Sequence, residues 1–276
     1  MCLLSSVCSY YIAIGRNMQE LWKNRPKSPK AKKILIPHRN CGIIASAGGC
    51  PAERSFSMCT INELYDLEHT AAKHYLAGFT YPWEALKGIA AFILELGTTL
   101  NKDDFLEISE HVWVHRTATV APTAYLGAPC IIGAGTEVRH CAFIRGSALV
   151  GENCVVGNST ELKNVILFDN VQVPHYNYVG DSILGYKAHM GAGSITSNVK
   201  SDKLLVVIKN GDEKIETGRK KFGAILGDHV EVGCNSVLNP GTILGRGVSV
   251  YPTSCVRGAI PENSIFKAPD NIAVRK

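Results

Sequence analysis

Residues 126–162 read LGAPCIIGAGTEVRHCAFIRGSALVGENCVVGNSTEL, and an aliphatic residue recurs in them at every sixth position. The spacing begins earlier in the chain and, after slips at Leu167 and Leu184, resumes between residues 226 and 256. The aliphatic positions of the first run are Val114, Val120, Leu126, Ile132, Val138, Ile144, Val150, Val156 and Leu162. A sustained period of six is typical of a parallel β-helix.

The fifth residue of each hexad is small, as at Ala118, Ala124, Cys130, Thr136, Ala142, Ala148, Cys154 and Thr160. We expect the aliphatic residue to fill the core and the small residue to let the chain turn a corner, so that three hexads form one triangular coil of about 18 residues. The sequence therefore predicts an all-β main domain over residues 110–268, a left-handed parallel β-helix of hexapeptide repeats.

One insertion, residues 199–222, interrupts the predicted coil. Its two apolar runs flank Asn210-Gly211, a strong signal for a hairpin turn. Because stacked coils of this kind are commonly completed by trimerisation, we expect a homotrimer in which this hairpin is an arm that reaches a neighbouring subunit.

The chain before the repeat divides in two. Residues 1–57 hold nine Lys/Arg against two Asp/Glu and show no sustained period. We expect an irregular, disordered or spurious extension, with the functional protein beginning at Met58. Its basic run at residues 23–33 lacks interleaved aromatic residues, so no nucleic-acid partner is expected.

Residues 58–100 predict a helical cap made of two helices. Thr60 and Glu63 form a capping box, and the first helix is expected to stop at Gly78. The second begins at Pro82 and ends at Gly97. Their apolar stripes are expected to cover the end of the β-helix.

The cysteines and the hydropathy bound the compartment. The ten cysteines contain no CxxC pair, and no apolar run reaches 18 residues. Cys130 and Cys154 occupy small-residue positions of the repeat, where a free thiol packs as a small hydrophobe. We expect a reduced, cytoplasmic compartment and no membrane partner.

Two cations stand at matching positions of the repeat. Arg145 and Lys163 each directly follow a core aliphatic residue one coil apart, so they are expected to stack on one face. They are either two solvated surface charges or a pair that faces one phosphate. His175 lies near a step of five residues, from Val179 to Leu184, which suggests a local departure in the coil. Taken alone, His175 is compatible with a structural role or with a role as a general base.

Four segments carry a family resemblance: STELK (159–163), PHYNYVGDSILG (174–185), GAGSITSN (191–198) and TGRKKFGAILGDHVEVG (217–233). Together they resemble the acetyltransferase domain of the bifunctional UDP-N-acetylglucosamine pyrophosphorylase/glucosamine-1-phosphate N-acetyltransferases. The order E-x-K, H-x-x-Y-x-G-D, G-A-G-[ST]-I-T-x-N is more specific than the hexads. The resemblance implies a stand-alone acyltransferase that uses acetyl-CoA as co-substrate and needs no metal, acting on glucosamine-1-phosphate or a relative in UDP-N-acetylhexosamine and cell-envelope precursor synthesis.

The resemblance also implies residue roles. His175 is the expected general base, a role that suits an imidazole because only an unprotonated amine attacks a thioester. The residues expected to bind the sugar phosphate are Arg145, Lys163 and Lys203. Tyr178 and Asn198 are expected to position the amino sugar. Ala192 and Cys234 are expected to contact acetyl-CoA.

The sequence departs from the family at several points. No Gly-rich nucleotide loop is present, since GGCPAERS (48–55) does not supply one, so nucleotidyl transfer is not expected. His189 and Cys234 stand where the family has Asn and Ser, and residues 198–201 read NVKS in place of Asn-Tyr-Asp-Gly. These changes leave the acceptor open.

Other functions compete for the same fold. An O-acetyltransferase on a sugar or small alcohol would use the same base, and a non-catalytic scaffold or regulatory subunit is compatible with the fold. A zinc carbonic anhydrase needs three suitably spaced histidines, and the sequence shows only scattered ones.

Overall fold

The computed structural model describes residues 60–211 and 213–274, which lie in one compact unit, Arg54–Lys276. The extension at residues 1–57, the proposed start at Met58 and the segment 48–55 fall outside the described residues.

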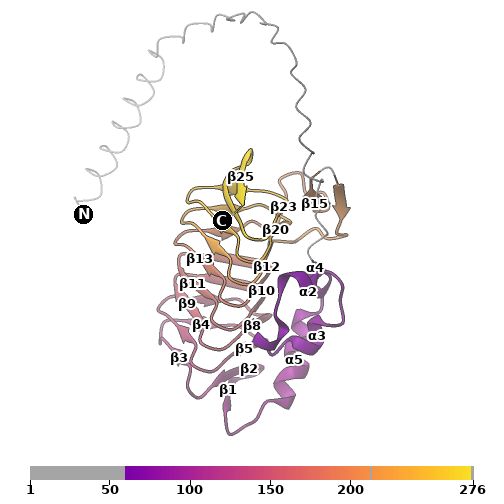
Figure 1. Ribbon diagram of the computed structural model, residues 1–276. Coiled ribbons are helices and arrows are strands. Elements are labelled where there is room, and N and C mark those ends of the chain that lie inside the picture. The colour runs from indigo at the N-terminus through magenta and orange to yellow at the C-terminus, as the bar shows by residue number, and fades with distance from the viewer. Residues whose placement is uncertain (1–59, 212, 275–276) are drawn as a thin grey trace, which may run out of the picture. The chain divides into compact units, whose positions relative to one another are not determined.

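Most of the described chain is a stack of β-coils (Figure 1). The 14-stranded sheet consists of β1 (Phe105–Ser109), β2 (Val112–His115), β4 (Tyr125–Leu126), β5 (Cys130–Ile132), β7 (Phe143–Ile144), β8 (Ala148–Val150), β10 (Glu161–Leu167), β12 (Tyr178–Leu184), β14 (Ile195–Thr196), β17 (Ala224–Leu226), β19 (Val237–Leu238), β20 (Thr242–Leu244), β22 (Cys255–Val256) and β23 (Ala259–Ile260). The 9-stranded sheet consists of β3 (Thr119–Val120), β6 (Glu137–Val138), β9 (Val155–Asn158), β11 (Gln172–His175), β13 (His189–Met190), β18 (Glu231–Val232), β21 (Ser249–Val250), β24 (Ser264–Ala268) and β25 (Asn271–Val274).

Three strands complete each coil. After β5, β6 and β7 the chain returns as β8, which pairs in parallel with β5. β10 and β12 run round a corner unbroken, so that β10 pairs with β7 through its first residues and with β8 through its last. Two faces of the triangle thereby join into one sheet. The predicted β-helix of hexapeptide repeats, preceded by a helical segment, is confirmed.

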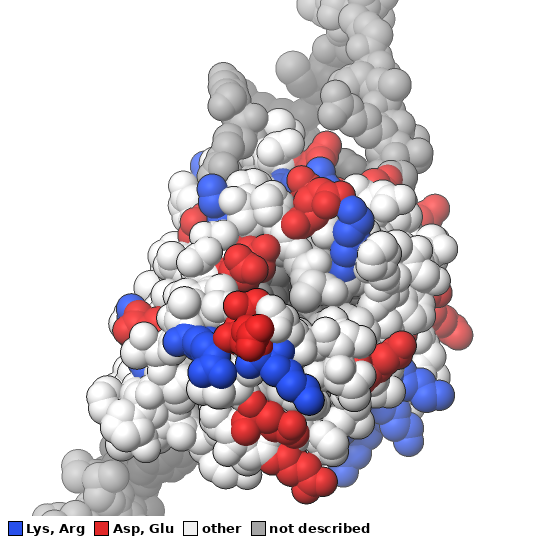
Figure 2. Space-filling model, turned by 90° about the horizontal axis from the view of Figure 1, so that it is seen from below, with Lys and Arg blue, Asp and Glu red and all other residues white. Residues whose placement is uncertain are grey.

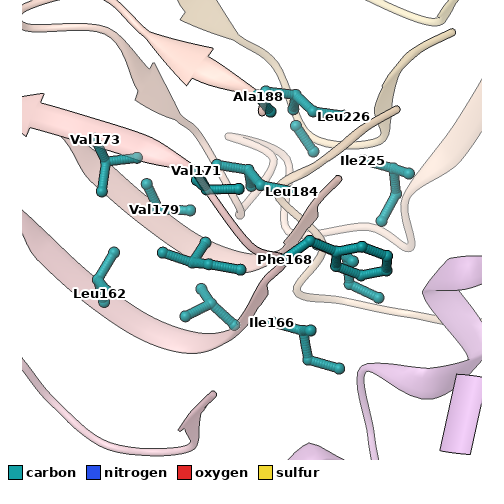
Figure 3. Close-up of a cluster of buried hydrophobic side chains, with 14 of the residues drawn as sticks. Leu162, Ile166, Phe168, Val171, Val173, Val179, Leu184, Ala188, Ile225 and Leu226 are labelled. Atoms are coloured by element: carbon teal, nitrogen blue, oxygen red, sulfur yellow. The ribbon is translucent and has the colours of Figure 1, made fainter. Parts of the chain in front are cut away.

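The corner positions explain the repeat. The small residues of the hexads from Cys130 to Thr160 are buried, and the hydroxyl of Thr136 donates to Gly151 O at 2.8 Å in the next coil. Aliphatic side chains from successive coils meet inside, as Leu162, Val179 and Leu184 do in Figure 3. This alternation of inward and outward residues fixes which side chains reach the surface.

The helical segment is more broken than the sequence predicts. It consists of α2 (Ile61–Leu64), η1 (Leu67–His69), α3 (Lys73–Leu76), α4 (Pro82–Ala85) and α5 (Ile89–Thr99). The capping box of Thr60 and Glu63 is present. The first expected helix is divided because the side chains of Asp66 and Thr70 accept from backbone N–H groups two residues on and compete with helical bonds.

Gly97 does not end the last helix, which continues to Thr99. A Cβ at Gly97 would lie 2.3 Å from the ring of Trp113, so this glycine serves close packing of α5 against β2. The helices lie along the side of the lower and middle coils in Figure 1, and Tyr65 packs against Phe168 with ring centroids 4.8 Å apart and the rings tilted by 34°.

The insertion forms the expected hairpin, β15 (Val207–Asn210) and β16 (Glu213–Glu216). Its base packs on the chain's own coil, since Val206 and Ile208 are buried and a Cβ at Gly241 would meet Val206 at 2.6 Å. Its reach toward a neighbouring subunit stays a prediction.

The described surface carries both signs of charge. Figure 2, which views the molecule from below Figure 1, shows acidic and basic side chains interspersed on that face. Within the described residues, no helix combines the length and the hydropathy needed to span a bilayer.

Candidate active site

The two predicted cations lie on neighbouring coils of one face. Ile144 pairs with Leu162, and Arg145 N–H donates to Leu162 O at 2.8 Å, which sets Arg145 and Lys163 one coil apart in the same column. Each has a carboxylate partner. Arg145 Nη1 lies 2.8 Å from Glu161 Oε1, and Lys163 Nζ lies 3.2 Å from Asp181 Oδ2. These carboxylates remove the repulsion between the stacked cations.

Asp181 organises this cluster from a buried position. Its carboxylate accepts from Lys163 Nζ, from Asn164 Nδ2 at 2.9 Å and from Asn198 Nδ2 at 2.6 Å. The residue is 3% exposed. A buried carboxylate with three donors holds them in fixed places, so Asp181 determines where the Lys163 ammonium and the Asn198 amide lie.

Tyr178 completes the polar face. It pairs with Glu161 across β10 and β12, and its hydroxyl accepts from Asn198 Nδ2 at 3.1 Å. Burial raises the pKa of Tyr178, and the negative charges of Asp181 and Glu161 raise it further. The phenol therefore stays a neutral hydrogen-bond donor at neutral pH.

His175 lies around the corner from this face, at the end of β11 and three residues before Tyr178. Its side chain is exposed. Its carbonyl accepts from Gly193 N–H at 3.0 Å, and Ala192 O accepts in the same way from Asn235 N–H at 2.8 Å. His175, Ala192 and Cys234 thus follow one another up a single corner of the coil. The expected base and the expected acetyl-CoA contacts form one column.

Asn177 fixes this corner, a role that the sequence did not reveal. Its Oδ1 accepts from His175 N–H at 3.1 Å, and its Nδ2 donates to Gly191 O at 2.9 Å and to Ser194 O at 3.1 Å. The side chain is buried, at 2% exposure. It therefore ties the backbone of His175 to the glycine turn above it.

The local departure in the coil falls between Val179 and Leu184, as the sequence predicts, with Asp181 at its corner. A second short step precedes Leu167, with Asn164 at its corner, and the φ angles of Asn164 and Asp181 are +55° and +49°. The step through His175 itself is regular. Asn164 and Asp181, which are hydrogen-bonded one coil apart, are separated by 17 residues. Lower in the stack, the hydrogen-bonded pair Thr136 and Cys154 is separated by 18 residues. From these two corners Asn164 and Asp181 contact each other, and Asp181 also contacts Lys163.

Lys203 stands apart from the cluster. It lies in a turn closed by Lys203 N–H to Lys200 O at 3.0 Å, its side chain is exposed, and within the described chain no contact joins it to Arg145 or Lys163. Across the insertion, Lys221 forms an antiparallel bridge with Val199, and Phe222 N–H donates to Asn198 O at 3.0 Å. A role for Lys203 stays a prediction.

Sequence reasoning missed Glu161 and Asp181 as site residues. Both stand inside the quoted segments, in STELK and in PHYNYVGDSILG, and the acidic side chains next to the cations were the available signal. His189, which replaces the family's Asn, lies 2.8 Å from Glu231 through its Nδ1 and is held on the neighbouring face.

Two further features bear on ligands. A groove of about 560 Å³ runs below His175 on the face of β3, β6 and β9 and is lined by His140 and Asn158 among others, apart from the cation cluster. In the described ranges, no group of three or more His, Cys, Asp or Glu side chains is placed to hold a metal ion.

Comparison with known proteins found no matching family model. The chain is 29% identical over 167 residues to a bifunctional sugar-1-phosphate nucleotidylyltransferase/acetyltransferase of Sulfurisphaera tokodaii, which covers 60% of this chain and 42% of that protein. It is 28% identical over 268 residues to the bifunctional protein GlmU of Methanococcus maripaludis, covering 92% and 65%, and 32% identical over 179 residues to GlmU of Nostoc, covering 64% and 34%.

Solved structures are more distant. The polysialic-acid-specific acetyltransferase NeuO matches at 14% identity and a TM-score of 0.39, over 60% of this chain and 88% of that one. The chain spans between a third and just under two thirds of the curated relatives above, which fits similarity to their acetyltransferase part alone. The resemblance seen in the sequence is thereby confirmed: this chain is a homologue of the bifunctional sugar-1-phosphate nucleotidylyltransferase/acetyltransferases.

Proposed function

We propose that the protein is an acetyl-CoA-dependent N-acetyltransferase that acts on an amino-sugar phosphate, glucosamine-1-phosphate or a relative, in UDP-N-acetylhexosamine synthesis. The observation that carries the proposal is one corner of the coil. On one side of it lies the column of His175, Ala192 and Cys234, and on the other the cation face of Arg145 and Lys163.

The chemistry fits these groups. His175 accepts the proton from the acceptor's amine as the nitrogen attacks the thioester carbonyl carbon. The C–S bond then breaks, and the thiolate of coenzyme A takes up a proton as it leaves. Ala192 N–H has no backbone acceptor among the described residues, whereas Gly191, Gly193 and Ser194 N–H all have one. It is the free donor for the oxygen on which negative charge develops.

The cation face binds the phosphate. Arg145 and Lys163 offer charge-assisted hydrogen bonds to its oxygens, and Lys203 is assigned to the same group from the insertion. The Tyr178 hydroxyl and the Asn198 amide lie next to these cations and orient the sugar. Acyl transfer by this route requires no metal, and no nucleotidyl transfer is assigned to the described residues.

The proposal includes a homotrimer. Tyr125 and Phe143 lie one coil apart on the cation face, with 59% and 43% of their surfaces exposed and ring centroids 5.5 Å apart. An exposed aromatic pair on a flat β-face is the kind of surface that a second copy covers.

The test is acetyl-CoA consumption, followed as free-thiol release with glucosamine-1-phosphate as acceptor. His175→Ala is expected to lower kcat by about 10²- to 10⁴-fold, the contribution of a general base. His140→Ala is the matched control, because it removes an exposed histidine from the same corner two coils below.

Each outcome has a meaning. Loss in His175→Ala with an active His140→Ala supports the base. Wild-type release no faster than the acceptor-free blank refutes glucosamine-1-phosphate as acceptor. Release with sugars or alcohols that lack an amine points to O-acetyl transfer, and a blank result with every acceptor points to a scaffold.

A further inference from the structure

The cation face is electrically balanced. Arg145 is paired with Glu161, and Lys163 with Asp181, so these four side chains carry no net charge. A phosphate monoester carries between one and two negative charges at neutral pH. To hold it, the site needs a cation that no carboxylate already neutralises.

The returning end of the insertion, residues 219–223, crosses this cluster. Phe222 N–H donates to Asn198 O at 3.0 Å, and Gly223 N–H donates to Asp181 O at 2.9 Å. A Cβ at Gly223 would lie 2.1 Å from Gly180 O, so the two backbones are in direct contact. The segment that carries Arg219 is therefore anchored on the residue that organises the site.

Arg219 is half-buried at the start of this segment. Its backbone is held by Val206 N–H to Arg219 O at 2.7 Å, and its Nε donates to Lys221 O at 3.3 Å. Within residues 60–211 and 213–274, its two Nη groups have no acceptor and no carboxylate forms an ion pair with it. Burial lowers the pKa of Arg219, and the negative charge of Asp181 opposes that change.

The helical segment forms a wall on this side. Asn164 Nδ2, which also holds Asp181, donates to Leu86 O at 3.1 Å, and Trp83 packs on Phe222 with ring centroids 6.1 Å apart. A wall that excludes water strengthens a charge-assisted hydrogen bond to a bound anion.

We propose that Arg219 is a further cation of the acceptor site, in addition to Arg145, Lys163 and the assigned Lys203. Its free Nη groups bind the phosphate of the sugar and supply surplus positive charge that the paired Arg145 and Lys163 lack. The inference rests on the proposed function for the identity of the acceptor. It makes Arg219 a determinant of specificity for phosphorylated over unphosphorylated amino sugars.

The test measures equilibrium binding by titration calorimetry, with glucosamine-1-phosphate, inorganic phosphate and glucosamine as probes. Arg219→Gln is expected to lower the affinity for glucosamine-1-phosphate and for inorganic phosphate by about tenfold or more, as for a lost hydrogen bond to a charged group. The affinity for glucosamine should not change. Arg219→Lys keeps the charge but loses the planar guanidinium. Its affinity for the two phosphate probes should therefore lie between those of the wild type and of Arg219→Gln.

Lys220→Gln is the matched control, since Lys220 is adjacent and exposed and carries the same charge change. Equal binding of glucosamine-1-phosphate by wild type and Arg219→Gln, or an equal loss in Lys220→Gln, overturns the inference alone. Arg219-dependent binding without thiol release overturns the proposed function alone. A wild type that binds neither glucosamine-1-phosphate nor inorganic phosphate overturns both the inference and the proposed function.

Discussion

At the scale of single residues, the site depends on buried polar groups that touch no substrate. Asn177 joins His175 to the glycine turn, and Asp181 joins Lys163 to Asn198. Such groups are costly to leave unpaired, so each acts on the chemistry through the side chains that it positions.

Asn177→Ala should destabilise the fold and slow acyl transfer. The change removes the Asn177 amide donor from Ser194 O and one of three donors from Gly191 O, at a cost of about 1–3 kcal/mol. Urea unfolding measures the first effect and kcat the second. Asn271→Ala, at an exposed position of β25, is the control, and equal stability of the two variants would contradict the role of Asn177.

The buried thiols make a second residue-scale prediction. Burial raises the pKa of Cys130 and of Cys154 to about 12, so both stay protonated in the folded protein through pH 9. Iodoacetamide at pH 8 should therefore label the exposed Cys141, Cys234 and Cys255 first and reach the buried pair only on unfolding. Peptide mass spectrometry distinguishes the sites, and early labelling of Cys154 would show that this corner opens.

At the scale of elements, one carboxylate joins the helical segment to the coil. Asp228 accepts from Asp66 N–H at 2.7 Å and from Tyr186 N–H at 2.8 Å, and it lies 3.7 Å from Arg246 Nε. Next to it, His69 stacks on Tyr186 with ring centroids 3.7 Å apart. The helices are therefore tied to the coil by polar bonds as well as by apolar packing.

Asp228→Ala should loosen this junction. It leaves the part-buried N–H groups of Asp66 and Tyr186 without their acceptor, and we expect a loss of about 1–3 kcal/mol in the free energy of unfolding, with faster proteolysis between residues 60 and 100. Asp228→Asn keeps one acceptor oxygen and should cost less. Asp270→Ala, at an exposed position, should leave both readouts unchanged, and a proteolysis rate that does not rise in Asp228→Ala would refute the junction.

At the scale of the whole molecule, the proposed trimer brings copies together on the cation face. Tyr125→Glu places a charge on the exposed aromatic pair, where burial in an interface would be costly. Light scattering should report three times 29.9 kDa for the wild type and a smaller mass for the variant. Tyr251→Glu, an exposed tyrosine at another face, is the control. A wild-type monomer would exclude the trimer.

Much of the fold could be predicted because its rules are local. Each hexad places its own core residue and its own corner, so positions such as Ile144 and Leu162 are set by six-residue spacing alone. The same regularity stacks Arg145 on Lys163. The helical segment was less predictable, because side chains such as that of Asp66 compete with helical hydrogen bonds over very short stretches.

The sequence by itself determined the β-helix, the hairpin in the insertion and the family resemblance, since these follow from spacing and contiguous motifs. Only the tertiary structure decided how the site is held and charged. Asp181 holds Lys163 from the next coil, and Gly223 reaches Asp181 only after the insertion has returned to the coil. These contacts join residues that are far apart in the sequence. No local sequence pattern predicts which of them meet, so only the packing of the folded chain brings them together.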